Sequence, residues 1–179
     1  MMRKVKEIRE SLSKGVKVCE ETPGWYRWWC EKESASKLLN PLNVNISQLL
    51  HQNIDGKDYV AIYFGISKKG KGLNGRLKWH ICQPHRQSAV ESGTLSTFRQ
   101  SLSALLGIKM VDAEKIVNSF IDECYVEFHN VPDSKEAEAM ESQELTHKDY
   151  LYPINIKDAK GTPKEIRSNL KALRKLYKW

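Results

Sequence analysis

The sequence predicts an α+β (mixed α/β) fold in which a small central three-stranded sheet is flanked by helices. Three short segments, residues 25–30, 59–66 and 125–131, are rich in the aromatic and β-branched residues typical of strands. Apolar residues at helical spacing occupy much of the remaining chain. A chain of 179 residues without internal repeats suits one domain with a sizeable core.

The first strand segment alternates, which assigns its side chains to opposite faces of the sheet. Trp25, Arg27 and Trp29 fall on one face, whereas Tyr26 and Trp28 fall on the other. Tryptophans could stack on unpaired bases, but we expect these three to pack in the core. Both faces of this strand are therefore expected to be covered.

The helices are predicted from apolar spacing and from residues that favour helix ends. Val5, Ile8 and Leu12 share one face of an N-terminal helix, and Asp112 and Asp133 are candidate N-caps. The predicted helices are residues 3–14, 73–81, 94–106, 112–121, 133–147 and 163–178, with shorter helical segments at 34–39 and 46–50 and a turn at Asp55-Gly56.

The composition favours a polyanionic partner. The formal net charge is +7 and the pI is about 9.2, which suits nucleic acid first and an anionic membrane surface second. No segment approaches the roughly 20 apolar residues that span a bilayer, and no secretory signal is evident. We therefore expect a cytoplasmic protein, not bound to a membrane, with four reduced cysteines that lack zinc-site spacing.

Four short motifs carry a resemblance to a known family. They are Gly24-Trp25-Tyr26, Tyr63-Phe64-Gly65, the run from Arg76 to His80, and a later helix that contains Glu141. In this order they resemble the GIY-YIG nucleases, and the resemblance covers about residues 22–156. Each residue alone is compatible with an ordinary structural role, but the ordered set favours a nuclease.

The sequence also differs from the compact members of the family in several places. Trp25 and Phe64 stand where aliphatic residues are usual, and residues 34–58 and 84–121 are expected to be insertions. A single GIY-YIG-like domain is then followed by a basic C-terminal helix at about 163–178. Such insertions are more typical of restriction-type and other stand-alone bacterial members.

The resemblance implies the chemistry of phosphodiester hydrolysis. Arg76 would hold phosphate oxygens with its guanidinium fork, and Glu141 would bind one divalent cation, Mg²⁺ or Mn²⁺. Tyr26 would accept a proton from water, although a free phenol has a pKa of about 10 and a nearby cation would have to lower it. His80 could share or relay that role, and Tyr63 would orient water or phosphate.

Two acids compete for the metal-ligand role on the same predicted helix. Ala137 and Leu145 frame Glu141 as the family frames its carboxylate, which makes Glu144 the second choice. Asn155 resembles an asparagine that closes this region of the family, where it supports the sheet or the site. We expect Asn155 to lie at the substrate-binding region.

DNA is the expected partner, bound through lysines beside the site. These are Lys68, Lys69, Lys71 and Lys78, and further Lys and Arg residues lie along the C-terminal helix. The alternatives are a non-catalytic nucleic-acid-binding or regulatory module on the same fold, and an interaction protein whose basic tail binds an acidic partner. The oligomeric state stays open, since a dimer or two successive nicks could cut both strands.

Overall fold

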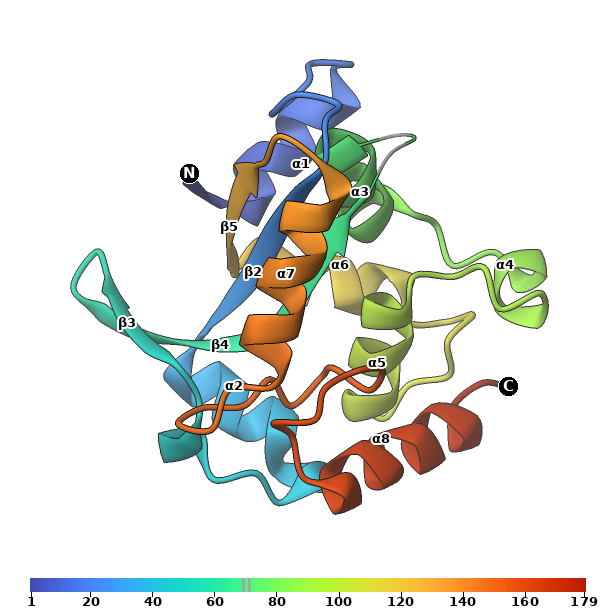
Figure 1. Cartoon of the computed structure of the whole chain (residues 1–179). Helices are drawn as coiled ribbons and strands as arrows, with labels where there is room; N and C mark the ends of the chain where they lie inside the picture. The colour runs from blue at the N-terminus through green and yellow to red at the C-terminus, as the bar shows by residue number, and fades with distance from the viewer. Residues whose placement is uncertain (69, 71) are drawn as a thin grey trace.

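An antiparallel sheet of five strands forms the centre of the protein, whose computed structural model describes residues 1–68, 70 and 72–179 (Figure 1). The strand order is β1-β5-β2-β4-β3. The strands are β1 (Met2–Lys4), β2 (Gly24–Glu31), β3 (His51–Ile54), β4 (Lys57–Ser67) and β5 (Tyr125–Asn130). The mixed α and β class is as predicted, but the expected three-stranded sheet is corrected to five strands.

The three predicted strands form the centre of the sheet, and the two that were missed lie at its edges. β1 has only three residues and immediately precedes a helix, so the predicted helix at residues 3–14 included two of its residues. β3 is polar and mostly exposed, so it lacks the apolar alternation that marks a half-buried strand. It pairs with β4 through a tight turn in which Asp55 and Gly56 both have positive φ, the geometry that Asp-Gly favours.

Eight α-helices surround the sheet in the described part of the chain. They are α1 (Val5–Ser13), α2 (Lys32–Leu39), α3 (Gly72–Cys82), α4 (Gln87–Glu91), α5 (Thr97–Leu105), α6 (Glu114–Asp122), α7 (Ser134–Leu145) and α8 (Lys164–Leu176), with 3₁₀ turns η1 (Asn40–Leu42) and η2 (Ile46–Gln48). Asp133 caps α7 as predicted, whereas Ala113 rather than Asp112 precedes α6. In the portion that the structure describes, none of the helices is long and apolar enough to cross a membrane.

The two faces of the sheet support two separate apolar clusters. Tyr26 and Trp28 face the larger cluster, which is completed by α1, α2, α3, α5, α6 and α8. Trp29 faces the smaller cluster, which α7 covers across the opposite face in Figure 1. The predicted alternation along β2 is thus confirmed, and Trp28 and Trp29 lie in the core as predicted, whereas Trp25 is only partly buried against the smaller cluster.

The two predicted insertions contribute to the main core. Leu38 and Leu39 of α2 and Phe98 and Leu102 of α5 are buried together with the sheet residues. Residues 34–58 are therefore not simply looped out, as the comparison with compact family members suggested. The extra helices bury the apolar face that they present to β2 and β4.

Candidate active site

Strand pairing brings the two tripeptides together. β2 and β4 are antiparallel, with Tyr26 opposite Gly65 and Trp28 opposite Tyr63. A Cβ atom added to Gly65 would lie 2.4 Å from the Tyr26 hydroxyl oxygen, so only glycine leaves room for that tyrosine. The rings of Tyr26 and Tyr63 then lie 6.3 Å apart on the same face of the sheet.

Helix α3 places Arg76 and His80 against the buried Tyr26 hydroxyl. The two residues are one helical turn apart, so both reach the same side of the helix. His80 Nε2 lies 2.7 Å from the Tyr26 hydroxyl oxygen, and Arg76 Nε donates to that oxygen at 3.3 Å. The guanidinium of Arg76 also stacks over the Trp79 ring at 4.2 Å, which fixes its orientation.

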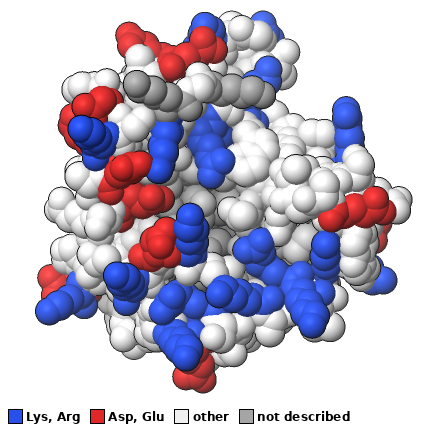
Figure 2. Space-filling model, turned by 45° about the vertical axis from the view of Figure 1, so that its right-hand side comes forward, with Lys and Arg blue, Asp and Glu red and all other residues white. Residues whose placement is uncertain are grey.

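These side chains adjoin an open cleft of about 1420 Å³. Tyr26, Tyr63, Arg76 and Glu141 all line this cleft, although they come from two strands and two helices. Figure 2 shows this side of the molecule hollowed near its centre, with Lys and Arg side chains around the hollow and a denser group along the lower edge. Four of the five predicted catalytic residues thus share one cavity, and His80 supports it from behind Tyr26.

Burial dominates the protonation of the tyrosines. The pKa of Tyr26 is raised well above its ordinary value, first by burial and then by the neighbouring Tyr63, although Arg76 opposes this rise. The pKa of Tyr63 is also raised, mainly by burial. The expected lowering of the Tyr26 pKa by a cation is therefore present but outweighed, and Tyr26 is a neutral phenol at pH 7.

His80 connects Tyr26 to a residue that the sequence analysis did not identify. Its Nδ1 lies 2.6 Å from Ser96 Oγ, which also caps α5 by accepting from the Arg99 backbone N–H. Burial, reinforced by Arg76 and Arg99, lowers the pKa of His80 well below its usual value. His80 is consequently a neutral imidazole, and each ring nitrogen faces a hydroxyl group.

The two candidate acids of α7 have different surroundings. Glu141 lines the cleft, and no hydrogen bond or ion pair joins its carboxylate to another described residue. Burial and the nearby Asp158 raise its pKa. Glu144 instead pairs with Arg27 at 2.8 Å and accepts hydrogen bonds from Tyr150 and Tyr152.

This difference bears on which acid could hold a cation. Within the described residues, no group of three or more His, Cys, Asp or Glu side chains is arranged to hold a metal ion. One carboxylate with free oxygens suits Mg²⁺, which keeps much of its water shell, better than it suits a metal held in a protein cage. Glu141 fits that requirement, whereas Glu144 is buried outside the cleft lining and its Oε2 already binds Arg27, Tyr150 and Tyr152.

The predicted substrate-binding residues divide into three groups. Asn155 exchanges two hydrogen bonds with the Phe64 backbone, at 2.9 and 2.7 Å, so it holds the loop after α7 against β4. Lys68 and Lys78 line the cleft, and Lys68 is paired with Glu138 at 2.5 Å. Lys69 and Lys71 lie outside the described residues.

Comparison with known proteins agrees with this arrangement. A family model described as the GIY-YIG catalytic domain matches residues 24–176, which include both tripeptides, α3 and α7. No curated protein and no solved structure matches the chain significantly. The family match extends over most of the chain, and the chain therefore belongs to the GIY-YIG superfamily of nucleases.

Proposed function

We propose that the protein is a metal-dependent endonuclease that hydrolyses DNA phosphodiester bonds at this cleft. The observation that carries the proposal is the convergence of Tyr26, Tyr63, Arg76 and Glu141 on one cavity, with His80 bonded to Tyr26. The residue types match the needs of the reaction, namely an anion holder, a carboxylate for a cation and groups that can move a proton.

Arg76 is suited to hold the scissile phosphate. Its Nε is engaged by Tyr26 and its plane is set by Trp79, while no hydrogen bond joins its terminal nitrogens to the described residues. Burial lowers its pKa, but Tyr26, Tyr63 and Glu141 outweigh burial and raise it, so it stays charged. A preorganised guanidinium aimed at developing negative charge stabilises the transition state without reorganisation.

Glu141 would hold the divalent cation, Mg²⁺ or Mn²⁺, that nucleases of this family generally use. When bound, such a cation neutralises charge on the phosphate and on the leaving oxygen. Burial and then the nearby Asp158 raise the pKa of Glu141, and Lys68, Lys157 and Arg76 only partly offset this rise. That environment favours binding of a positive ion.

Tyr26 and His80 provide a route for the proton of the attacking water. Tyr26 is neutral, so it cannot act as a free phenolate. Its hydroxyl can accept the water proton while it passes its own proton to the neutral His80 Nε2, 2.7 Å away. The water O–H bond breaks, the new O–P bond forms, and the bond from phosphorus to the leaving oxygen breaks. The leaving oxygen keeps that electron pair and takes up a proton from solvent, and His80 later releases its extra proton.

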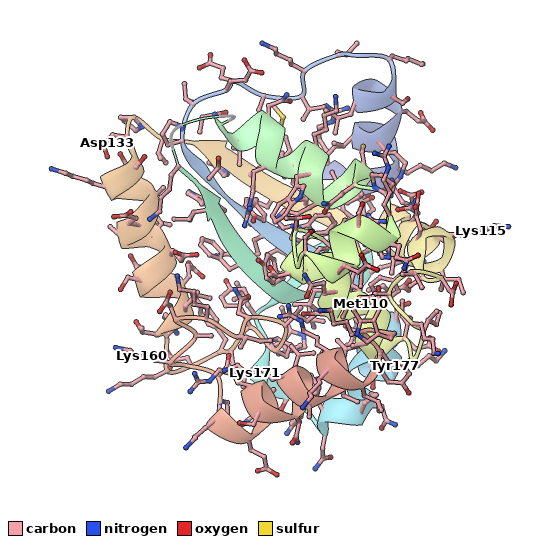
Figure 3. All side chains as sticks on the ribbon, turned by 90° about the vertical axis from the view of Figure 1, so that its right-hand side faces the viewer. Met110, Lys115, Asp133, Lys160, Lys171 and Tyr177 are labelled. Carbon is pink, nitrogen blue, oxygen red and sulfur yellow. The ribbon has the colours of Figure 1, made fainter. Side chains whose placement is uncertain are left out.

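The test is cleavage of duplex and single-stranded DNA with and without Mg²⁺ or Mn²⁺. Arg76→Ala should lower the cleavage rate by about 10²–10³-fold, because one preorganised donor to a developing charge is lost. Lys115→Ala provides the control, since Lys115 is an exposed cation on α6, away from the cleft (Figure 3).

Two outcomes would overturn the proposal. One is unchanged metal-dependent cleavage by a folded Arg76→Ala protein. The other is an absence of cleavage of both DNA forms with either metal, combined with salt-sensitive DNA binding, which would support the non-catalytic binding module.

A further inference from the structure

Helix α8 is fixed to the body of the protein rather than hanging from it as a basic tail. Leu170 is fully buried in the main core, and Leu173 packs against it. The far end of the helix is also held, because the Met110 backbone N–H donates to the Tyr177 carbonyl at 2.9 Å. Figure 3 shows Lys171 and Tyr177 along this helix, with Met110 above its C-terminal half.

One cation of α8, Arg174, lines the same cleft as Arg76. Arg174 is half-buried, and its Nη2 donates to the side-chain oxygen of Gln100 on α5. The Gln100 amide nitrogen in turn donates to the Leu95 carbonyl at 2.5 Å, which fixes which end of the amide faces Arg174. Arg174 is thus held in place by a neutral, oriented partner.

Among the described residues, three of the five other cleft cations are paired with acids, whereas no ion pair joins Arg76 or Lys78 to an acid. Lys17 pairs with Glu21 at 2.9 Å, Lys68 pairs with Glu138 at 2.5 Å, and Lys157 lies 3.9 Å from Asp158. No ion pair joins Arg174 to any carboxylate among the described residues. A half-buried guanidinium that has only an amide partner retains its full charge for an anion that enters the cleft.

Arg174 also lies on a different wall of the cleft from Arg76. Arg76 projects from α3, whereas Arg174 projects from α8 beside Thr97 and Ser101 of α5. Burial lowers the pKa of Arg174, and the nearby Tyr63 opposes this effect, which places Tyr63 within electrostatic reach of both arginines. A chain of phosphates that follows the cleft past Tyr63 would meet both arginines, because all three side chains line it.

We propose that Arg174 binds a DNA backbone phosphate adjacent to the scissile phosphate. This subsite rests on the proposed nuclease function, and it makes α8 a wall of the substrate channel rather than a solvated tail. A guanidinium suits the role because its planar fork matches two phosphate oxygens. Such a contact positions the strand without reading its sequence.

The first test measures DNA binding in EDTA as a function of salt. Arg174→Ala should lower the magnitude of the slope of log K against log salt by about one, the value for a single lost phosphate contact. Lys175→Ala is the matched control, because it removes the same charge from the same helix at an exposed position outside the cleft. It should change the slope much less.

The second test compares two substrates in the presence of Mn²⁺. Bis(p-nitrophenyl) phosphate has one phosphodiester and no neighbouring phosphate, so Arg174→Ala should lose much less activity on it than on DNA. The same variant should lose about 10- to 100-fold in kcat/KM on DNA, in the range of one charge-assisted contact. Arg76→Ala should lose activity on both substrates.

The outcomes separate the subsite from the nuclease function. Equal salt slopes for Arg174→Ala and Lys175→Ala, or equal losses on both substrates for Arg174→Ala, would overturn the subsite. If wild-type protein hydrolyses neither substrate but the slope difference persists, the nuclease proposal fails and the phosphate site stands. Arg174→Gln, which is neutral and can retain part of the packing, replaces the alanine variant if that variant does not fold.

Discussion

Two polar clusters lie on opposite faces of β2, and they are built around consecutive residues, Tyr26 and Arg27. On one face, Tyr26 contacts His80 and Arg76 at the cleft. On the other, Arg27 pairs with Glu127 at 3.0 Å and Glu144 at 2.8 Å. The clusters use similar residue types, but the first lines the cleft through Tyr26 and Arg76, whereas the charges of the second are paired with each other.

The clusters differ in whether their charges are compensated within the protein. Arg27 bonds two carboxylates and the Tyr152 hydroxyl, and it also stacks among aromatic rings. These contacts satisfy the cluster internally, as expected for a structural ion pair. At the cleft, Glu141 lacks such a partner among the described residues. The bonding partners of the charged residues therefore distinguish the two clusters better than the residue types do.

Helix α7 offers the largest test of this contrast, because it supplies one acid to each cluster. Glu141→Gln should lower metal-dependent DNA cleavage by about 10²–10³-fold, since the proposed cation ligand is lost. Its stability should be kept or slightly raised: the pKa of Glu141 is raised in the folded state, so its ionised form opposes folding at pH 7. Cleavage rates and denaturant unfolding would measure both effects.

Glu144→Gln should show the reverse pattern. Removing one partner of a buried ion pair destabilises a fold by about 3 kcal/mol, the low end of the usual range, because Glu127 still neutralises Arg27. Cleavage by the folded fraction should stay near the wild-type rate. If Glu144→Gln loses cleavage without losing stability while Glu141→Gln does not, the assignment of the two acids is reversed.

The next predicted effect is smaller than those of the two glutamate variants, and it concerns the loss of stability at acid pH. Burial lowers the pKa of His80 below its unfolded value, so the unfolded state takes up a proton first as the pH falls. The contribution of His80 to the free energy of unfolding is fully present above about pH 6.5. Below that pH it decreases by up to about 1.4 kcal/mol per pH unit. His85, whose pKa is also lowered, adds to the same slope.

Denaturant unfolding at pH 7.5, 6.5 and 5.5 would measure this dependence. His80→Gln should flatten the slope below pH 6.5, because the buried neutral imidazole that produces it is lost. An identical slope in wild type and His80→Gln would show that His80 is not buried as a neutral imidazole.

The sequence was sufficient for the central strands and for the common direction of several candidate residues, because those features depend on local pattern. The alternation of β2 predicted which side chains share a face, and the spacing of Arg76 and His80 predicted their common direction. The sequence ranked Glu141 above Glu144 only through the family resemblance, since the two acids lie three residues apart on one helix. The partners of Glu144 on β2 and in the loop after α7 distinguish them in the structure.

The features that sequence could not predict depend on contacts between distant segments. Ser96 and Arg174 belong to a predicted insertion and a predicted tail, and neither carries a local motif. Ser96 lies 16 residues from His80, and Arg174 reaches the cleft because α8 packs on α5. The edge strands were missed for other reasons. The exposed polar residues of β3 gain stability from pairing rather than from burial, and β1 has only three residues before α1 begins.

Ser96 gives the smallest predicted change and tests whether the cleft cluster extends beyond Tyr26. If its hydroxyl positions the His80 ring, Ser96→Ala should lower kcat on DNA by about tenfold, alter the pH profile of kcat and leave KM nearly unchanged. Loss of the α5 cap should also cost about 1 kcal/mol of stability. Ser96→Thr keeps the hydroxyl and should restore kcat. A purely structural cap would instead lower stability while kcat and its pH profile stay at wild-type values, because capping alone does not hold the imidazole that takes the proton from Tyr26.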